Sequence, residues 1–305
     1  MKTVFLLLFA AIGLQAKTVT IPQRFWDRPV AVDDYTVLTA GFNSKELPII
    51  ADYALGAKGI GGGQYKAGEQ GRFGLAVATT KLGGFLRFAG GSNLSPAAAT
   101  VRMFVKGKFL AGKKPKTFFS ALGPDYSIAA IKYPDSMALE LRKKLYHPSQ
   151  GKRILCAVQM PVGKLSADQW YSVVVSWDRY KKQGAVFLAG KGATGRLTFP
   201  ENTREFLYFN LASGTRAKNF PDGLSIPGTA FDELQVYNGW YEDILKPVKK
   251  LSDAEENKLK AMLHAVRNYG HVAEKLQRWG GWEVLYTWPN MFGSEAQGRG
   301  LIQYP

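Results

Sequence analysis

Short segments in which apolar and polar residues alternate constrain this chain more than any other feature. Within residues 100–106, Val101, Met103 and Val105 fall on one face of an extended strand. Comparable segments recur along the chain at residues 137–141, 170–177, 185–189, 206–209 and 231–237. Turn residues bound these segments and no helical pattern separates them. The sequence therefore predicts an all-β fold, in which two antiparallel sheets pack as a sandwich.

Three regions depart from this pattern. Residues 56–74 are rich in glycine and lack the strand-to-helix context of a dinucleotide loop, so they favour a flexible connection or a bulged edge strand. Ser252 and Glu255 form a capping box that predicts a helix over about 253–268. Residues 270–305 are rich in tryptophan and glycine and have no clear period.

The N-terminus carries the features of a secretory signal. Lys2 precedes an apolar run over residues 3–14, and Ala16 offers a small residue for cleavage before Lys17. The alternative is a buried N-terminal strand. We expect a signal peptide over residues 1–16 and a secreted protein, extracellular or periplasmic. No later segment is long enough for a transmembrane helix.

The rest of the chain is long enough for one large β domain. We place the sandwich at residues 17–250, followed by the helix and tail at 251–305. Cys156 is the chain's one cysteine and alternates with Ile154 and Val158, which predicts a buried strand position without an internal disulfide.

The charge points to acidic partners. The chain carries 40 lysines and arginines against 24 aspartates and glutamates, a formal net charge of +16. An exported basic protein meets acidic polysaccharides, cell-wall polymers, anionic lipid or nucleic acid, although a basic surface can also be merely solvated. We expect an acidic polysaccharide or glycan as the partner, no specific nucleic acid, and a place in a larger extracellular assembly as an alternative.

Four stretches, in order, resemble the laminin-G-like, or concanavalin-A-like, jelly roll. GRFGLAV at 71–77 resembles the entry strand of that family, and SNLSP with ATVRMFVK, within 92–106, resembles its turn and "GTVEFWVKP" strand. The hairpin within 170–190 is similar to "WHVAxTWD…LYVDG", with Tyr171 in place of the histidine and Ala189 in place of the aspartate. FDELQVYN at 231–238 resembles the closing strand, and LSDAEE the "LSxEE" that follows it.

The resemblance implies a jelly-roll fold that lectins, adhesion modules, accessory domains and glycan-cleaving enzymes share, so function rests on the site. It also implies a structural Ca²⁺. The closing-strand aspartate of the family matches Asp232, and the N-terminal turn would contribute Asn43. The alternative is that Asp232 only accepts hydrogen bonds from neighbouring backbone.

A basic hairpin loop over residues 141–153 is the leading candidate for binding. Basic side chains pair with carboxylate or sulfate groups, and aromatic faces stack on sugar rings. The candidate residues are Arg142, Lys143, Lys144, Tyr146, His147 and Arg153. The alternative is a solvated hairpin tip.

Catalytic signatures are sparse. Glycan hydrolases of this architecture carry two carboxylates on one strand, spaced to face one cleft. Asp232 and Glu233 do not form such a pair, because adjacent residues of a strand point to opposite faces. We therefore expect a glycan-binding module of lectin or accessory type. The enzymatic alternative is a hydrolase or a lyase, with Tyr146 or His147 as the base and Arg142 or Arg153 neutralising a uronate. The third possibility is an adhesion or assembly protein.

Overall fold

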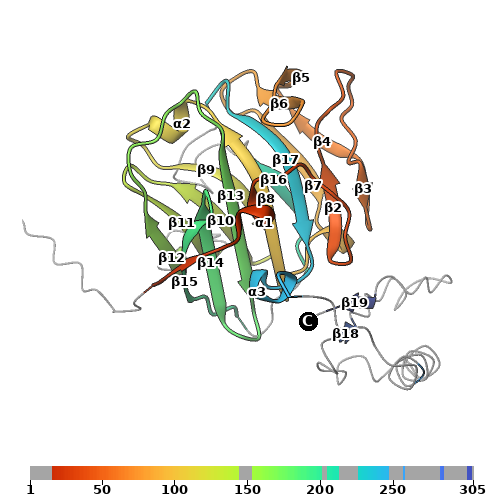
Figure 1. The fold of residues 1–305 in the computed structure, drawn as a ribbon, viewed down its shortest axis with the longest axis vertical. Helices are drawn as coiled ribbons and strands as arrows, with labels where there is room; N and C mark the ends of the chain where they lie inside the picture. The colour runs from red at the N-terminus through yellow and green to blue at the C-terminus, as the bar shows by residue number, and fades with distance from the viewer. Residues whose placement is uncertain are drawn as a thin grey trace, which may run out of the picture.

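A computed structural model describes residues 16–143, 153–200, 205–212, 226–246, 257, 282–284 and 301–303. Within these residues two antiparallel sheets face one another (Figure 1). The larger sheet contains β1 (Lys17–Thr20), β2 (Thr36–Ala40), β3 (Tyr53–Ala54), β5 (Tyr65–Gln70), β6 (Leu75–Thr79), β8 (Ala98–Lys106), β13 (Tyr171–Asp178), β14 (Gln183–Leu188), β15 (Lys191–Arg196) and β17 (Ala230–Tyr237). Its main order is β1-β15-β14-β13-β8-β17-β2-β3, with β6 paired to β17 and β5 to β6.

The second sheet has the order β12-β11-β10-β9-β16-β7-β4 among the described residues. Its strands are β4 (Ile60–Gly63), β7 (Phe85–Ala89), β9 (Lys116–Leu122), β10 (Tyr126–Lys132), β11 (Ser136–Lys143), β12 (Ile154–Pro161) and β16 (Tyr208–Leu211). The helical elements are short: α1 (Gln23–Trp26), η1 (Gly91–Asn93), α2 (Lys108–Ala111) and α3 (Tyr241–Ile244). A separate two-stranded sheet pairs β18 (Trp282–Val284) with β19 (Leu301–Gln303).

The core lies between the two sheets and follows the alternation in the sequence. Val101, Met103 and Val105 of β8 are buried in it, as predicted. Aromatic rings join the layers, and Phe88 stacks on Phe209 with ring centroids 4.8 Å apart. Stacked aromatic pairs stabilise a core beyond the area they bury. The predicted two-sheet jelly-roll sandwich is confirmed.

The central strand β17 is interrupted by a bulge. Its pairing with β8 shifts register between Asp232 and Gln235, and Glu233 has a left-handed φ of 53°. Phe231 and Leu234, on either side, both pack in the core. The expectation that Asp232 and Glu233 point to opposite faces is therefore wrong, because the extra residue of a bulge leaves both carboxylates away from the core.

The outer face of the ten-stranded sheet is covered by the N-terminal segment and α3. Ile21 and Phe25 pack there with Trp240 and Tyr241, and α1 crosses in front of β13 and β8 in Figure 1. This covering explains why the strands of this sheet are buried on both faces, whereas the sequence alone predicts one buried face.

Other expectations have mixed outcomes. The segment predicted at 206–209 forms β16 two residues later, at Tyr208–Leu211. The glycine-rich region forms an edge strand, β5, whose pairing shifts register at Gly68. Cys156 lies in β12 and is only partly buried against the core. The predicted signal over 1–16 and helix over 253–268 fall almost wholly outside the described residues. No helix within those residues is long and apolar enough to cross a membrane.

Candidate functional site

An open groove of about 440 Å³ lies where β5, β6, β8 and β17 of the ten-stranded sheet meet the loop before β13. Lys66 and Glu69 come from β5, Lys106 from the end of β8, and Trp170 from the loop. These segments are remote in sequence, and the sheet order brings them together (Figure 1). The groove is large enough for a small sugar unit.

The floor of the groove is held by close backbone contacts. The Thr79 hydroxyl donates to the Ile226 carbonyl at 2.9 Å and accepts from the Thr229 amide at 3.2 Å. Gly107 ends β8 with a φ of 140°, and a Cβ there would lie 2.8 Å from the Gly228 carbonyl oxygen. Only glycine permits this approach without strain. The groove therefore has a fixed floor.

The walls combine an aromatic ring with an excess of positive charge. The Lys106 ammonium lies 5.9 Å from the centroid of the half-buried Trp170 ring. Lys66 forms an ion pair with Glu69 across the register shift of β5 at Gly68. The described lining carries three lysines against two carboxylates, with Lys108 and Asp168 completing the set. An indole face beside an ammonium suits a ring that bears a negative charge.

The predicted basic hairpin is present, because β11 and β12 pair and the Lys143 amide donates to the Arg153 carbonyl at 2.7 Å. Lys143 and Arg153 lie at its base. Lys144, Tyr146 and His147 lie outside the described residues.

Arg142 is not a loop residue. It belongs to β11, its side chain is 1% exposed, and it forms an ion pair with Glu140 at 2.7 Å. Tyr133 donates its hydroxyl proton to the other oxygen of Glu140. Because the ladder extends two residues further than expected, Arg142 lies on the outer face of the seven-stranded sheet, where Glu140 neutralises it. A surface role for Arg142 in glycan binding does not fit this placement.

The two predicted calcium ligands hold the same turn. Asp232 Oδ2 accepts the amides of Arg72 at 2.6 Å and Phe73 at 3.0 Å. Asn43 Oδ1 accepts the amide of Leu75 at 2.9 Å. Their oxygens therefore tie the 71–75 turn to the closing strand and to the N-terminal turn.

Burial perturbs the acids of the β17 bulge. Burial raises the pKa of Asp232 to about 6, against the opposing effect of the hydrogen bonds from Phe73 and Arg72. Burial also raises the pKa of Glu233 to about 7, although the Val30 amide donates to it. Asp232 Oδ1 is buried and accepts no hydrogen bond from the part of the chain that the structure describes. The described residues contain no group of three or more His, Cys, Asp or Glu arranged for a metal.

The groove was not predicted from the sequence. Trp170 looked like the first residue of a strand and Lys106 like the last residue of another, so neither stood out. The available signal was the placement of both at strand ends, where side chains leave the ladder.

Neither a protein-family model nor a curated protein sequence matches this chain. Among solved structures, the binding domain of botulinum neurotoxin DC in complex with SialylT has a TM-score of 0.50 and 11% identity, over 76% of this chain and 52% of that chain. The receptor-binding domain of the botulinum neurotoxin C/D mosaic serotype has a TM-score of 0.49 and 9% identity, over 76% of this chain and 52% of that chain. A Trypanosoma rangeli sialidase has a TM-score of 0.45 and 14% identity, over 77% and 34%.

This chain is similar in fold to part of a toxin binding domain. The match spans about half of that domain's length, and at 11% identity it extends to the β-sandwich and no further.

Proposed function

We propose that this chain is an exported glycan-binding module that takes an acidic glycan in the groove at Trp170. The Lys106–Trp170 pair, set in an open groove with a fixed floor, carries the proposal. A sugar ring would stack on the indole, and its carboxylate or sulfate would meet Lys106 or Lys108. The net charge of +16 favours the same ligand class, and a protein of similar fold is known in complex with SialylT.

The test is calorimetric titration with uronic-acid oligomers, sulfated oligosaccharides and neutral oligomers. Trp170→Ala and Lys106→Met should each weaken binding of the acidic ligand at least about tenfold, because a few central contacts dominate binding free energy. Tyr180→Ala is the matched aromatic control, since Tyr180 is exposed in the β13–β14 turn. Unchanged affinity in both groove variants would overturn the proposal.

The hairpin is a separate arm of the same experiment. Lys143→Met removes a charge at its described base, whereas Lys106→Met removes one in the groove. Exposed charge pairs contribute about 0.2–1 kcal/mol each. Lys143→Met should therefore weaken binding less than Lys106→Met, because Lys106 also lies against the Trp170 ring. Binding should also weaken with salt, as the Debye length falls from about 30 Å at 0.01 M to about 8 Å at 0.15 M.

The enzymatic alternative has its own readout in these mixtures. A lyase would generate unsaturated ends that absorb in the near-ultraviolet, and a hydrolase would release reducing ends. We expect neither product. Steady product formation on any acidic glycan would replace the binding-module proposal with an enzymatic one.

We also propose that Asp232 and Asn43 contribute to a structural Ca²⁺ site. The buried Oδ1 of Asp232, which accepts no hydrogen bond from any described residue, supports the proposal. Ca²⁺ takes about six to eight oxygen ligands, so backbone carbonyls and water would complete the set. The bound ion would stabilise the 71–75 turn against β17 rather than take part in chemistry.

A further inference from the structure

Arg87 of β7 is clamped on the outer face of the seven-stranded sheet. Its guanidinium carbon lies 3.9 Å from the centroid of the Tyr208 ring and 5.0 Å from that of Phe85. Its Nε donates to Asn210 Oδ1 at 3.0 Å. Two aromatic faces and one hydrogen bond fix the plane of the guanidinium, so little side-chain entropy remains to be lost on binding.

The two Nη atoms of this guanidinium have no hydrogen-bond partner among the described residues. Among those residues no carboxylate pairs with Arg87 either, so its side-chain hydrogen bond there is the one that Nε donates to Asn210. Arg142 on the same sheet face is the contrast, because Glu140 neutralises it at 2.7 Å. A guanidinium presents its donors as a planar fork that matches a carboxylate.

The neighbouring strand leaves space beside Arg87. In the pairing of β4 with β7, Gly61 lies opposite Arg87 and Gly63 opposite Phe85. A Cβ at Gly61 would have its nearest described neighbour, the Arg87 carbonyl oxygen, at 3.9 Å, and a Cβ at Gly63 would meet no described atom within 4 Å. The edge strand β4 therefore exposes backbone without side chains at Gly61 and Gly63, beside the side chains of Arg87 and Phe85.

We propose that Arg87, Phe85, Tyr208 and the β4 glycines form a second binding site, which takes a sugar ring bearing a carboxylate. The carboxylate would accept both Nη donors of Arg87, and the ring would lie over Gly61 and Gly63 against the Phe85 face. This site belongs to the other sheet from the groove at Trp170, so it stands independently of the proposed function.

The experiment uses the full chain with Trp170→Ala, which removes the groove's stacking residue. Glucuronate, galacturonate and N-acetylneuraminate are titrated while the amide resonances of Gly61 and Gly63 are followed by NMR. We expect saturable shifts with at least one of these acids and none with the corresponding neutral sugars. Absence of shifts with all three acids would overturn the proposal.

Two variants separate recognition from folding. Arg87→Lys keeps the charge but loses the fork, and should weaken binding at least about tenfold. Gly63→Val keeps Arg87 intact and fills the floor, and should block binding while the melting temperature stays close to that of the parent, since the new side chain meets open space and valine suits a strand. Binding to Gly63→Val as tight as to the parent would refute the site.

The two sites fail separately. Loss of groove binding in Trp170→Ala with retained shifts at Gly61 and Gly63 supports both proposals. Retained groove binding in Arg87→Lys, measured by calorimetry in the chain with Trp170 intact, shows that a negative result at the Arg87 site leaves the groove unaffected. Sulfated monosaccharides that shift Gly61 as strongly as the carboxylates would contradict the carboxylate as the recognised group.

Discussion

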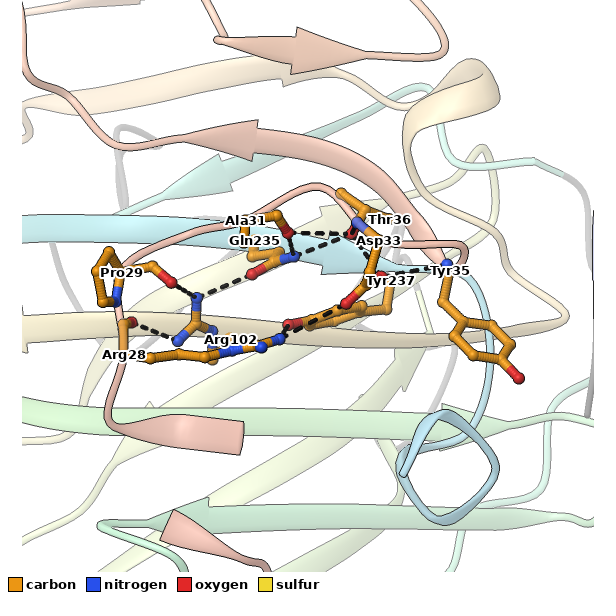
Figure 2. A network of polar contacts seen from close by, with 9 residues as sticks. All are labelled: Arg28, Pro29, Ala31, Asp33, Tyr35, Thr36, Arg102, Gln235 and Tyr237. Carbon is orange, nitrogen blue, oxygen red and sulfur yellow. Dashed lines mark hydrogen bonds and ion pairs between the residues drawn. The ribbon is translucent and has the colours of Figure 1, made fainter. Parts of the chain in front are cut away.

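Arg102 donates a hydrogen bond of 2.8 Å to the Gln235 side chain, and both residues are fully buried between the ten-stranded sheet and the N-terminal segment (Figure 2). The same guanidinium donates to the carbonyls of Arg28 at 2.6 Å and Pro29 at 3.2 Å. Carbonyl and amide oxygens, rather than a carboxylate, accept hydrogen bonds from the Nη atoms of this buried cation, and its buried Nε has no partner among the described residues. The contact fixes the segment before β2 onto the sheet.

Replacing Arg102 should therefore release that segment. Arg102→Met keeps most of the side-chain volume but removes the donor to three acceptors, of which the Gln235 side-chain oxygen is buried, at about 1–3 kcal/mol for each acceptor that water cannot reach. We expect unfolding in urea to require about 2–4 kcal/mol less. Arg72→Met is the control, because the half-exposed Arg72 pairs with Asp27 at 3.1 Å and its loss should cost under about 1 kcal/mol. Equal losses in both variants would contradict this account.

The Glu140–Arg142 pair makes a second prediction. Glu140→Gln leaves the buried Arg142 without its described carboxylate partner, and breaking a buried pair costs about 3–5 kcal/mol. Chemical denaturation should report a loss of this size. Replacing both residues by Gln and Met should recover part of the loss, because no uncompensated charge remains. A double variant as unstable as Glu140→Gln would contradict the unpaired charge of Arg142 as the cause of the loss.

The strands were predictable where burial on the core face follows a strict alternation, as in β8 and β11. The bulge at Glu233 was not, because its left-handed φ of 53° is imposed by tertiary contacts and not by the residue type. The burial of Arg142 had a signal in the sequence, since Glu140 lies two residues earlier and so on the same strand face. The groove had only a weak signal, the placement of Lys106 and Trp170 at strand ends, because the two residues meet only once the strand order is known.

The proposed export predicts where the mature chain begins. We expect cleavage after Ala16, so that Lys17 becomes the N-terminus. Lys17 is the first residue of β1 and lies opposite Thr194 of β15, so cleavage there would leave the edge strand complete. Mass spectrometry of the secreted protein should find Lys17 at its start. Met1 retained on the secreted protein would contradict the signal.

The acids of the β17 bulge predict an unusual pH dependence. The pKa of Asp232 is raised from 3.8 to about 6, and that of Glu233 from 4.5 to about 7. The native state therefore binds more protons than the unfolded chain between about pH 4 and pH 7. The contribution of these groups to the free energy of unfolding is full below about pH 4 and is lost as the pH rises to about 7. Asp232→Asn should flatten the part of this dependence between about pH 4 and pH 6, measured by thermal melts in a chelator.

Bound Ca²⁺ would reverse this pH dependence of stability, because the ion binds the ionised carboxylate and stabilises the native state by mass action. If Asp232 holds Ca²⁺, excess Ca²⁺ should raise the melting temperature at pH 7, and the increase should shrink toward pH 5 as protons compete for Asp232. Asp232→Asn should lose the increase, whereas Arg72→Met, which changes a side chain of the same turn, should keep it. Identical melting temperatures with Ca²⁺ and with chelator would contradict the calcium site and leave Asp232 only as an acceptor of the Arg72 and Phe73 amides. The pH dependence measured in the chelator would then apply to the protein in either condition.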